Sequence, residues 1–102
     1  KRMYRVQVKV GRWDMRGSTP ALKASFSEPY FPEEVDVIAL VDLDSSTVYY
    51  VPVEDLTPGT LGITIRFDKP RESSAFDATE CLGWPWPIEN ETREEEENGD
   101  QD

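Results

Sequence analysis

Apolar and polar residues alternate from Tyr4 to Val10. The apolar positions are Tyr4, Val6, Val8 and Val10, and the polar positions between them are Arg5, Gln7 and Lys9. A period of two is typical of a β-strand with one face on a core and one polar face. The pattern predicts a strand whose valines are buried and whose Gln7 and Lys9 side chains project together from the opposite face.

Four later segments also have strand patterns. Residues 21–27 fit a short strand, and residues 35–41 form a nearly continuous apolar run, which predicts a central strand buried on both faces. Residues 47–53 are expected to return antiparallel after a short turn, with Pro52 near a sheet edge. Residues 62–67 are expected to form one further strand. Within the apolar run, Asp36 is expected to be a hydrogen-bonded strand acid.

The segments between these strands carry turn and loop signals. Residues 11–20 contain two glycines and a proline and are expected to be a loop, as are the polar residues 68–74. Residues 54–56 fit a single helical turn. The last residues expected to join the core are Phe76, Leu82, Trp84 and Trp86.

Length and composition bound the architecture. The chain has 102 residues, enough for one domain, which is expected to span residues 1–87. Residues 88–102 contain eight acids and almost nothing apolar, so they are expected to form a disordered tail. No apolar run approaches the roughly 20 residues that cross a bilayer, and the lone cysteine, Cys81, fits a reducing compartment. A cytoplasmic protein without membrane partners is therefore expected.

Charge is divided unevenly along the chain. Residues 1–27 hold seven bases and one acid, whereas residues 28–65 hold eight acids and no base. A basic segment of this kind favours contact with phosphate. The candidate DNA-binding residues are Arg5, Arg12, Arg16 and Lys23. Trp13 is equally compatible with stacking on DNA and with anchoring the loop in the core.

Few residues are available for chemistry. The chain has no histidine, which excludes histidine-based triads and the common histidine zinc sites. The strongest remaining candidates are Gln7 and Lys9, because an oxygen ligand and a cation two residues apart share one strand face. A metal-dependent phosphodiesterase needs oxygen ligands for a hard cation and a positive charge beside the phosphate. The backbone carbonyl of Val8 is a further candidate metal ligand.

The string from Tyr4 to Arg12 resembles the third-strand motif of PD-(D/E)xK nucleases. It is most similar to a small branch that includes group I intron-type homing endonucleases, in which Gln replaces the acid before x-Lys. The apolar run and the string at residues 47–53 resemble the hairpin of that branch, and Gly62 to Pro70 resembles its closing strand and the loop that follows. The resemblance therefore covers roughly residues 4–70.

The resemblance implies an α/β, restriction-endonuclease-like fold that is truncated here to a mixed, mainly antiparallel sheet of four or five strands with little helix. It also implies Mg²⁺ as cofactor, double-stranded DNA as substrate, and Gln7 and Lys9 as catalytic residues. In this family the acidic helix and the aspartate strand precede the x-Lys strand. Both are therefore expected upstream of Lys1, and the chain is expected to be a fragment.

Other interpretations remain open. Gln7 and Lys9 also fit the solvated face of an edge strand, and the fold also fits a non-catalytic module that binds nucleic acid or protein, or a plain structural domain. A second copy of the chain is a further candidate partner. Trp84 and Trp86 fit either a site for a proline-rich segment or, in the favoured interpretation, a cap on the core.

Overall fold

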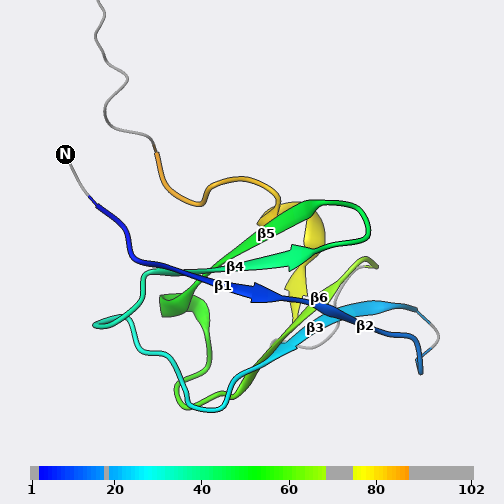
Figure 1. Cartoon of the computed structure of the whole chain (residues 1–102), viewed down its shortest axis with the longest axis horizontal. Coiled ribbons are helices and arrows are strands. Elements are labelled where there is room, and N and C mark those ends of the chain that lie inside the picture. The colour runs from blue at the N-terminus through cyan, green and yellow to red at the C-terminus, as the bar shows by residue number, and fades with distance from the viewer. Residues whose placement is uncertain (1–2, 18, 69–74, 88–102) are drawn as a thin grey trace, which may run out of the picture.

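Among the residues that the structure describes, seven short strands form two β-sheets around one apolar core (Figure 1). The computed structural model describes residues 3–17, 19–68 and 75–87. In chain order the elements are β1 (Val6–Val10), β2 (Arg12–Asp14), β3 (Ala21–Ser25), β4 (Val37–Asp42), β5 (Thr47–Pro52), η1 (Val53–Asp55), β6 (Gly62–Arg66), β7 (Phe76–Asp77) and η2 (Ala78–Cys81). The two η elements are short 3-10 helices, so the described residues contain little helix, as predicted.

The first sheet has the strand order β1-β4-β5. β4 and β5 form the predicted antiparallel hairpin, with Asp42 opposite Thr47 at its turn. Residues 37–40 of β4 are all buried, which confirms the prediction of a central strand covered on both faces. β1 pairs with β4 in parallel. Among the described strands β1 and β5 are therefore the edges, and Pro52 ends an edge strand as expected.

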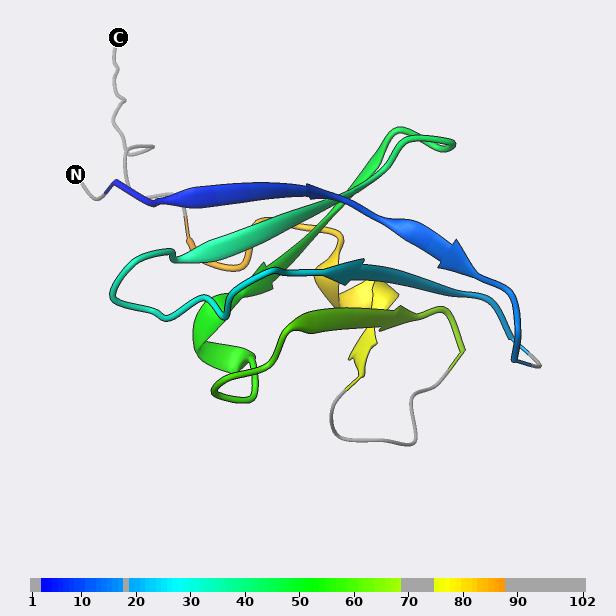
Figure 2. The ribbon, with the colours of Figure 1, turned by 60° about the horizontal axis from the view of Figure 1, so that its bottom comes forward.

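The second sheet has the order β2-β3-β6-β7. The prediction that residues 11–20 are entirely loop is wrong, because Arg12–Asp14 pairs antiparallel with β3. Gly11 marks the change of sheet: its N–H donates to the Val41 carbonyl at 2.8 Å, whereas the next residue already pairs with Lys23. Figure 2 shows β2 continuing directly from β1.

The strands thus divide between two sheets, whereas the sequence predicts one mixed sheet of four or five strands. The division follows from the bend at Gly11, which carries one continuous stretch of chain from the first sheet into the second. The mainly antiparallel character is confirmed, since the β2–β3, β3–β6 and β4–β5 pairings are antiparallel. The restriction-endonuclease-like arrangement stays a prediction.

Burial in the first strand is the reverse of the prediction. Val6, Val8 and Val10 are 46, 59 and 55% exposed, whereas Gln7 and Lys9 are half-buried. The alternation itself is present, because the valines share one face and the two polar residues share the other. The error concerns which of the two faces meets the core.

The inward face is set by residues beyond the strand. A Cβ at Gly11 would lie 2.8 Å from side-chain atoms of Leu22, so this position faces the core, and Trp13 packs against the core as well. Alternation puts positions 9, 11 and 13 on one side of the extended chain. Lys9 and Gln7 therefore turn inward along with Trp13.

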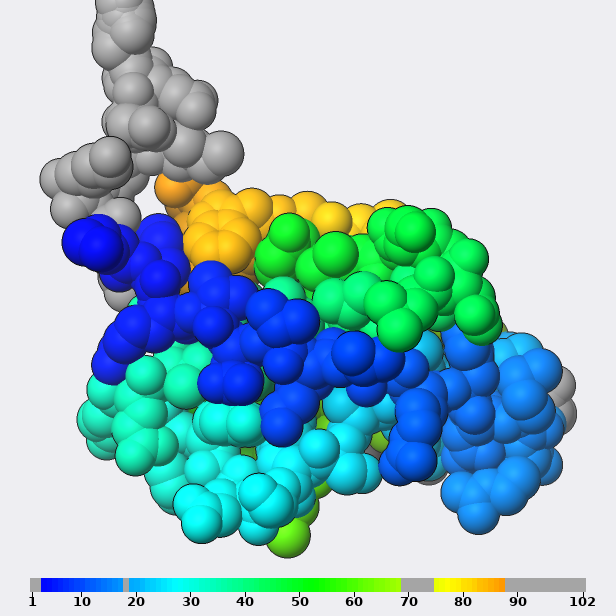
Figure 3. Space-filling view, in the orientation of Figure 1, coloured from blue at the N-terminus to red at the C-terminus, as the bar shows by residue number. Residues whose placement is uncertain are grey.

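Aromatic rings close one end of the first sheet. Tyr4 stacks on Trp86 with ring centroids 4.6 Å apart, and Trp84 meets Tyr4 and Tyr50 edge-on at 5.3 and 5.5 Å. In Figure 3 the segment that ends at residue 87, drawn in orange, lies against the blue N-terminal residues. The packing agrees with a capping role for both tryptophans, but Leu82, expected in the core, is 51% exposed.

Phe76 packs against the core as predicted. The tail at residues 88–102, predicted to be disordered, lies outside the described residues. In the part of the chain that the structure covers, no helix has the length and apolar character needed to cross a membrane.

Candidate functional site

Gln7 and Lys9 leave β1 on the same side, as their spacing predicts. They lie beside two fully buried residues of β4 in the parallel pairing. The Lys9 ammonium is 5.8 Å from the ring centroid of Phe26 and 5.7 Å from that of Tyr30. Such cation–π contacts contribute on the order of 0.5–1 kcal/mol each at exposed sites. Lys9 is therefore a positioned cation on the inner face of an edge strand.

The backbone of β1 presents hydrogen-bonding groups on its open edge. The Arg5 carbonyl accepts from the Val37 N–H at 3.3 Å, and the Gly11 N–H bonds to Val41, so both residues turn their backbone toward β4. Backbone groups alternate between the two sides of a strand, which directs those of Val8 away from β4. No described strand pairs with this edge. The Val8 carbonyl, a predicted metal ligand, points there.

These residues do not make a magnesium site on their own. The described residues hold no group of three or more His, Cys, Asp and Glu side chains suited to a metal ion. The oxygen donors predicted here, the Gln7 amide and the Val8 carbonyl, are both neutral, whereas proteins hold Mg²⁺ through carboxylates. The set therefore does not fit Mg²⁺ without carboxylates from other residues.

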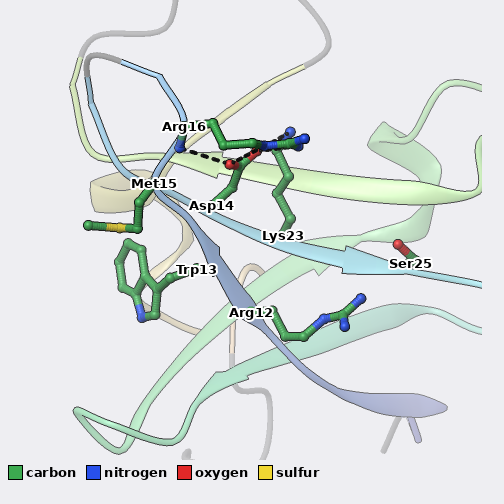
Figure 4. Close-up of a pocket in the computed structure, with 7 residues that line it drawn as sticks. All are labelled: Arg12, Trp13, Asp14, Met15, Arg16, Lys23 and Ser25. Carbon is green, nitrogen blue, oxygen red and sulfur yellow. Dashed lines mark hydrogen bonds and ion pairs between the residues drawn. The ribbon is translucent and has the colours of Figure 1, made fainter.

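Three of the predicted DNA-binding side chains come together on the second sheet. Arg12 of β2 lies opposite Lys23 of β3, and Arg16 follows β2 in the hairpin turn. All three line a cavity of about 580 Å³, which Figure 4 shows in close-up. A hollow lined by three cations has the charge and size to receive a backbone phosphate.

Asp14 orders two of these cations. Its carboxylate accepts from Arg16 Nε at 2.9 Å and pairs with Lys23 Nζ at 3.1 Å. The hydrogen bond from Arg16, followed by that from Lys23, holds the pKa of Asp14 well below its usual range. Arg12 makes no ion pair with any described residue. Sequence reasoning gave Asp14 no role, although its spacing to Arg16 was a local signal.

Arg5, the fourth predicted DNA-binding residue, lies apart from this cavity. Its side chain binds the Asp36 carboxylate through Nε and Nη2, each at 3.2 Å, and also donates to the carbonyls of Pro32 and Glu33. These bonds confirm the prediction that Asp36 is hydrogen-bonded, although Asp36 lies just before β4 and not within a strand. They also give Arg5 a structural role, because its side chain holds the loop before β4 against the start of β1.

The lysine of β1 and the basic cavity do not form one continuous site. Alternation along the β1–β2 stretch puts Lys9 on the inner side of the chain and Arg12 on the outer side, with the bend at Gly11 between them. The structure thus brings together Gln7 with Lys9 at one place, and Arg12, Arg16 and Lys23 at another.

Trp13 serves the fold. Its ring lies 5.0 Å from that of Phe67, and its Nε1 donates to the Asp42 carboxylate at 3.1 Å. Asp42 is 4% exposed and also accepts from the Ser45 hydroxyl at 2.7 Å. The Ser45 and Trp13 hydrogen bonds lower the pKa of Asp42. Of the two roles considered for Trp13, the structure supports the core anchor.

This carboxylate leads to a pH prediction. A carboxyl group whose pKa is lower in the folded than in the unfolded chain stabilises the fold above its unfolded pKa, about 4. That stabilisation is lost as pH falls through the folded pKa. We therefore expect the melting temperature to decrease below about pH 4, and to decrease less steeply in Asp42→Asn. Calorimetric melts of both proteins from neutral to acid pH measure this; parallel curves would contradict it.

Cys81 offers no nucleophile. The thiol is buried, and burial raises its pKa to about 11, which keeps it protonated at neutral pH.

Comparisons with protein-family models, with curated proteins and with solved structures found no match to this chain.

Proposed function

We propose that this chain provides the lysine-bearing strand of a Mg²⁺-dependent DNA endonuclease. The observation that supports it most directly is the position of Lys9, which shares a strand face with Gln7 and lies above the rings of Phe26 and Tyr30. A lysine without a functional role on an edge strand normally extends its ammonium group into water. A held ammonium is instead a preorganised charge, the kind that stabilises charge developing in a transition state.

The chemistry assigned to Lys9 is electrostatic. In phosphodiester hydrolysis a water oxygen bonds to phosphorus, the bond to the leaving oxygen breaks, and negative charge increases on the phosphoryl and leaving oxygens. An ammonium beside the phosphate opposes that charge and orients the attacking water. Gln7, on the same face, supplies a neutral oxygen and therefore a smaller contribution.

The proposal requires carboxylates that the described residues near Lys9 do not supply. The resemblance to PD-(D/E)xK nucleases implies that they come from a helix and a strand preceding Lys1. The open edge of β1 offers backbone groups with which a further strand can pair. The exposed valines of β1 form an apolar face that further apolar residues can cover. The carboxylates would then arrive beside Gln7 and Lys9.

Plasmid cleavage tests this function. A longer protein that includes the upstream helix and strand is expected to nick or cut plasmid DNA in Mg²⁺ and to stop in EDTA, whereas the present chain alone is expected not to cut. Absence of cleavage by the longer, folded protein would overturn the proposal.

A second candidate is a non-catalytic module that binds DNA. The observation that favours it is the cavity, which Arg12, Arg16 and Lys23 line together and where Asp14 pairs with Arg16 and Lys23. Arg16 uses Nε and Nη2 on Asp14, which leaves its Nη1 donors for a phosphate.

Salt-dependent binding tests this candidate. We expect duplex DNA to bind weakly and to weaken steeply as salt increases, because each neutralised phosphate releases counterions. Replacing Arg12 and Lys23 together by alanine is expected to reduce the slope of log affinity against log salt by about 2. Arg5→Ala is the matched control, since it also removes a cation but lies outside the cavity. A reduction in Arg5→Ala half as large as in the double variant, measured by fluorescence anisotropy, would assign the binding to net charge alone.

A further inference from the structure

A second surface of this chain has the chemistry of a peptide-binding groove. It lies between the loop before β4 and the segment that follows β5, which Figures 1 and 2 place side by side. The groove has a volume of about 260 Å³, with Val53 and Leu56 at its buried base. Tyr30, Phe31 and Pro58 contribute to its walls.

Hydrogen bonds fix the two walls relative to each other. Arg5 holds the first wall through the carbonyls of Pro32 and Glu33 and the carboxylate of Asp36. The Val53 N–H donates to the Asp36 carbonyl at 3.0 Å, which joins the second wall to the first. A preformed groove loses little freedom when a ligand enters it.

Apolar and aromatic surface remains open to solvent in this groove. Phe31 is 42% exposed, and the prolines on both walls are exposed as well. Aromatic and proline side chains around a shallow groove are the features that bind extended, proline-containing peptides, which lose little entropy on binding. The volume suits a few side chains of such a peptide and is small for a cofactor.

Charge identifies the kind of peptide. The charged side chains that line the groove are Glu33 and Glu54, both acidic and exposed. They belong to the segment from Glu28 to Ile65, which has eight acids and no base. An arginine or lysine flanking the apolar residues of a ligand would meet these carboxylates at the rim.

We infer that this groove binds an extended, proline-containing segment of a partner protein that carries basic residues beside its apolar ones. The cavity lined by Arg12, Arg16 and Lys23 and the groove would then contact different ligands. DNA is repelled by the acidic rim of the groove, and a basic peptide is repelled by the three cations of the cavity.

The experiment uses a labelled peptide with proline and leucine between arginines, and the same peptide with glutamate in place of arginine. Fluorescence anisotropy at low salt is expected to detect micromolar to millimolar binding of the arginine peptide and none of the glutamate peptide. Phe31→Ala is expected to weaken binding about tenfold. The double variant Glu33→Gln, Glu54→Gln is expected to weaken it several-fold and to remove most of its salt dependence.

Leu43→Ser is the matched control, because Leu43 is 66% exposed in the β4–β5 turn and does not line the groove. It is expected to bind the peptide unchanged, and thermal melts of every variant establish that each is folded. Equal binding of the two peptides, no binding of either at millimolar concentration, or unchanged binding by Phe31→Ala would each overturn the inference. DNA binding by Phe31→Ala separates this result from the proposed function, since it is expected to stay unchanged.

Discussion

Lys9→Ala is expected to reduce plasmid cleavage by the longer, Mg²⁺-dependent protein by about 10²–10³-fold while leaving DNA binding nearly intact. Loss of one preorganised group that stabilises transition-state charge typically has an effect of about this size. Binding survives because the ammonium acts mainly on charge that develops during the reaction. The measurement is the initial rate of nicking, beside the affinity for the same plasmid fragment.

Two further substitutions separate charge from packing at this position. Lys9→Met keeps an apolar stem over Phe26 and Tyr30 but removes the ammonium, so it is expected to lose cleavage as fully as alanine does. Gln7→Ala removes only a neutral oxygen and is expected to have a smaller effect. If Lys9→Ala and the unmodified protein nick DNA at the same rate, the first strand does not carry the activity.

The second large effect is on stability. Leu22 is fully buried, and its side chain lies where a Cβ at Gly11 would be only 2.8 Å away. Leu22→Ala is expected to reduce the free energy of unfolding by about 3 kcal/mol, since it removes buried apolar volume and leaves a cavity. Gly11→Ala is expected to reduce it by about 1–3 kcal/mol, because the added methyl overlaps Leu22.

Combining the two substitutions gives the decisive comparison. The alanine methyl at position 11 enters the space that Leu22→Ala vacates, so the double variant is expected to lose clearly less than the sum of the two single losses. Urea unfolding of the four proteins measures the coupling. If the two losses in free energy of unfolding simply add, position 11 does not face Leu22. The inward orientation of Lys9 would then not follow from the Gly11–Leu22 contact. Leu43→Ala, at an exposed position, is expected to change stability by less than about 0.5 kcal/mol.

The strands that could be predicted are those with a strong local pattern. The hairpin of β4 and β5 follows from an apolar run, a polar turn and a second β-branched run, and it is present within one residue at most ends. β2 and β7 are only three and two residues long, although each pairs with a neighbouring strand in the sequence. Such short strands leave little trace in a window of sequence.

The orientation of β1 could not be read from its own residues. Its neighbour β4 is apolar on both faces, so either face of β1 would find apolar contacts beside it. The choice is made by Trp13 and by the contact of Gly11 with Leu22, which lie beyond the end of the strand. Alternation predicts that Gln7 and Lys9 share a face, and it cannot predict which face is buried.

The candidate site could likewise be predicted only where it depends on the local pattern of residues. The pairing of Gln7 with Lys9 follows from period two, and the meeting of Arg12 with Lys23 needs only the β2–β3 hairpin. The separate position of Arg5 depends on its bonds to a loop 27 to 31 residues away. A contact across that distance has no signature in the local pattern.

The parallel pairing of β1 has a consequence for how the chain acquires its fold. Val6 pairs with Val37 and Ala21 pairs with Arg66, whereas Asp42 pairs with Thr47 only five positions on. Closing the longer loops costs more chain entropy, so the β4–β5 hairpin is expected to form before the remaining pairings. Hairpins of this kind form within about 1–10 μs. A domain dominated by distant contacts folds in milliseconds to seconds. During synthesis, β1 therefore leaves the ribosome well before its partner strand exists, and its valines stay without a sheet until β4 follows.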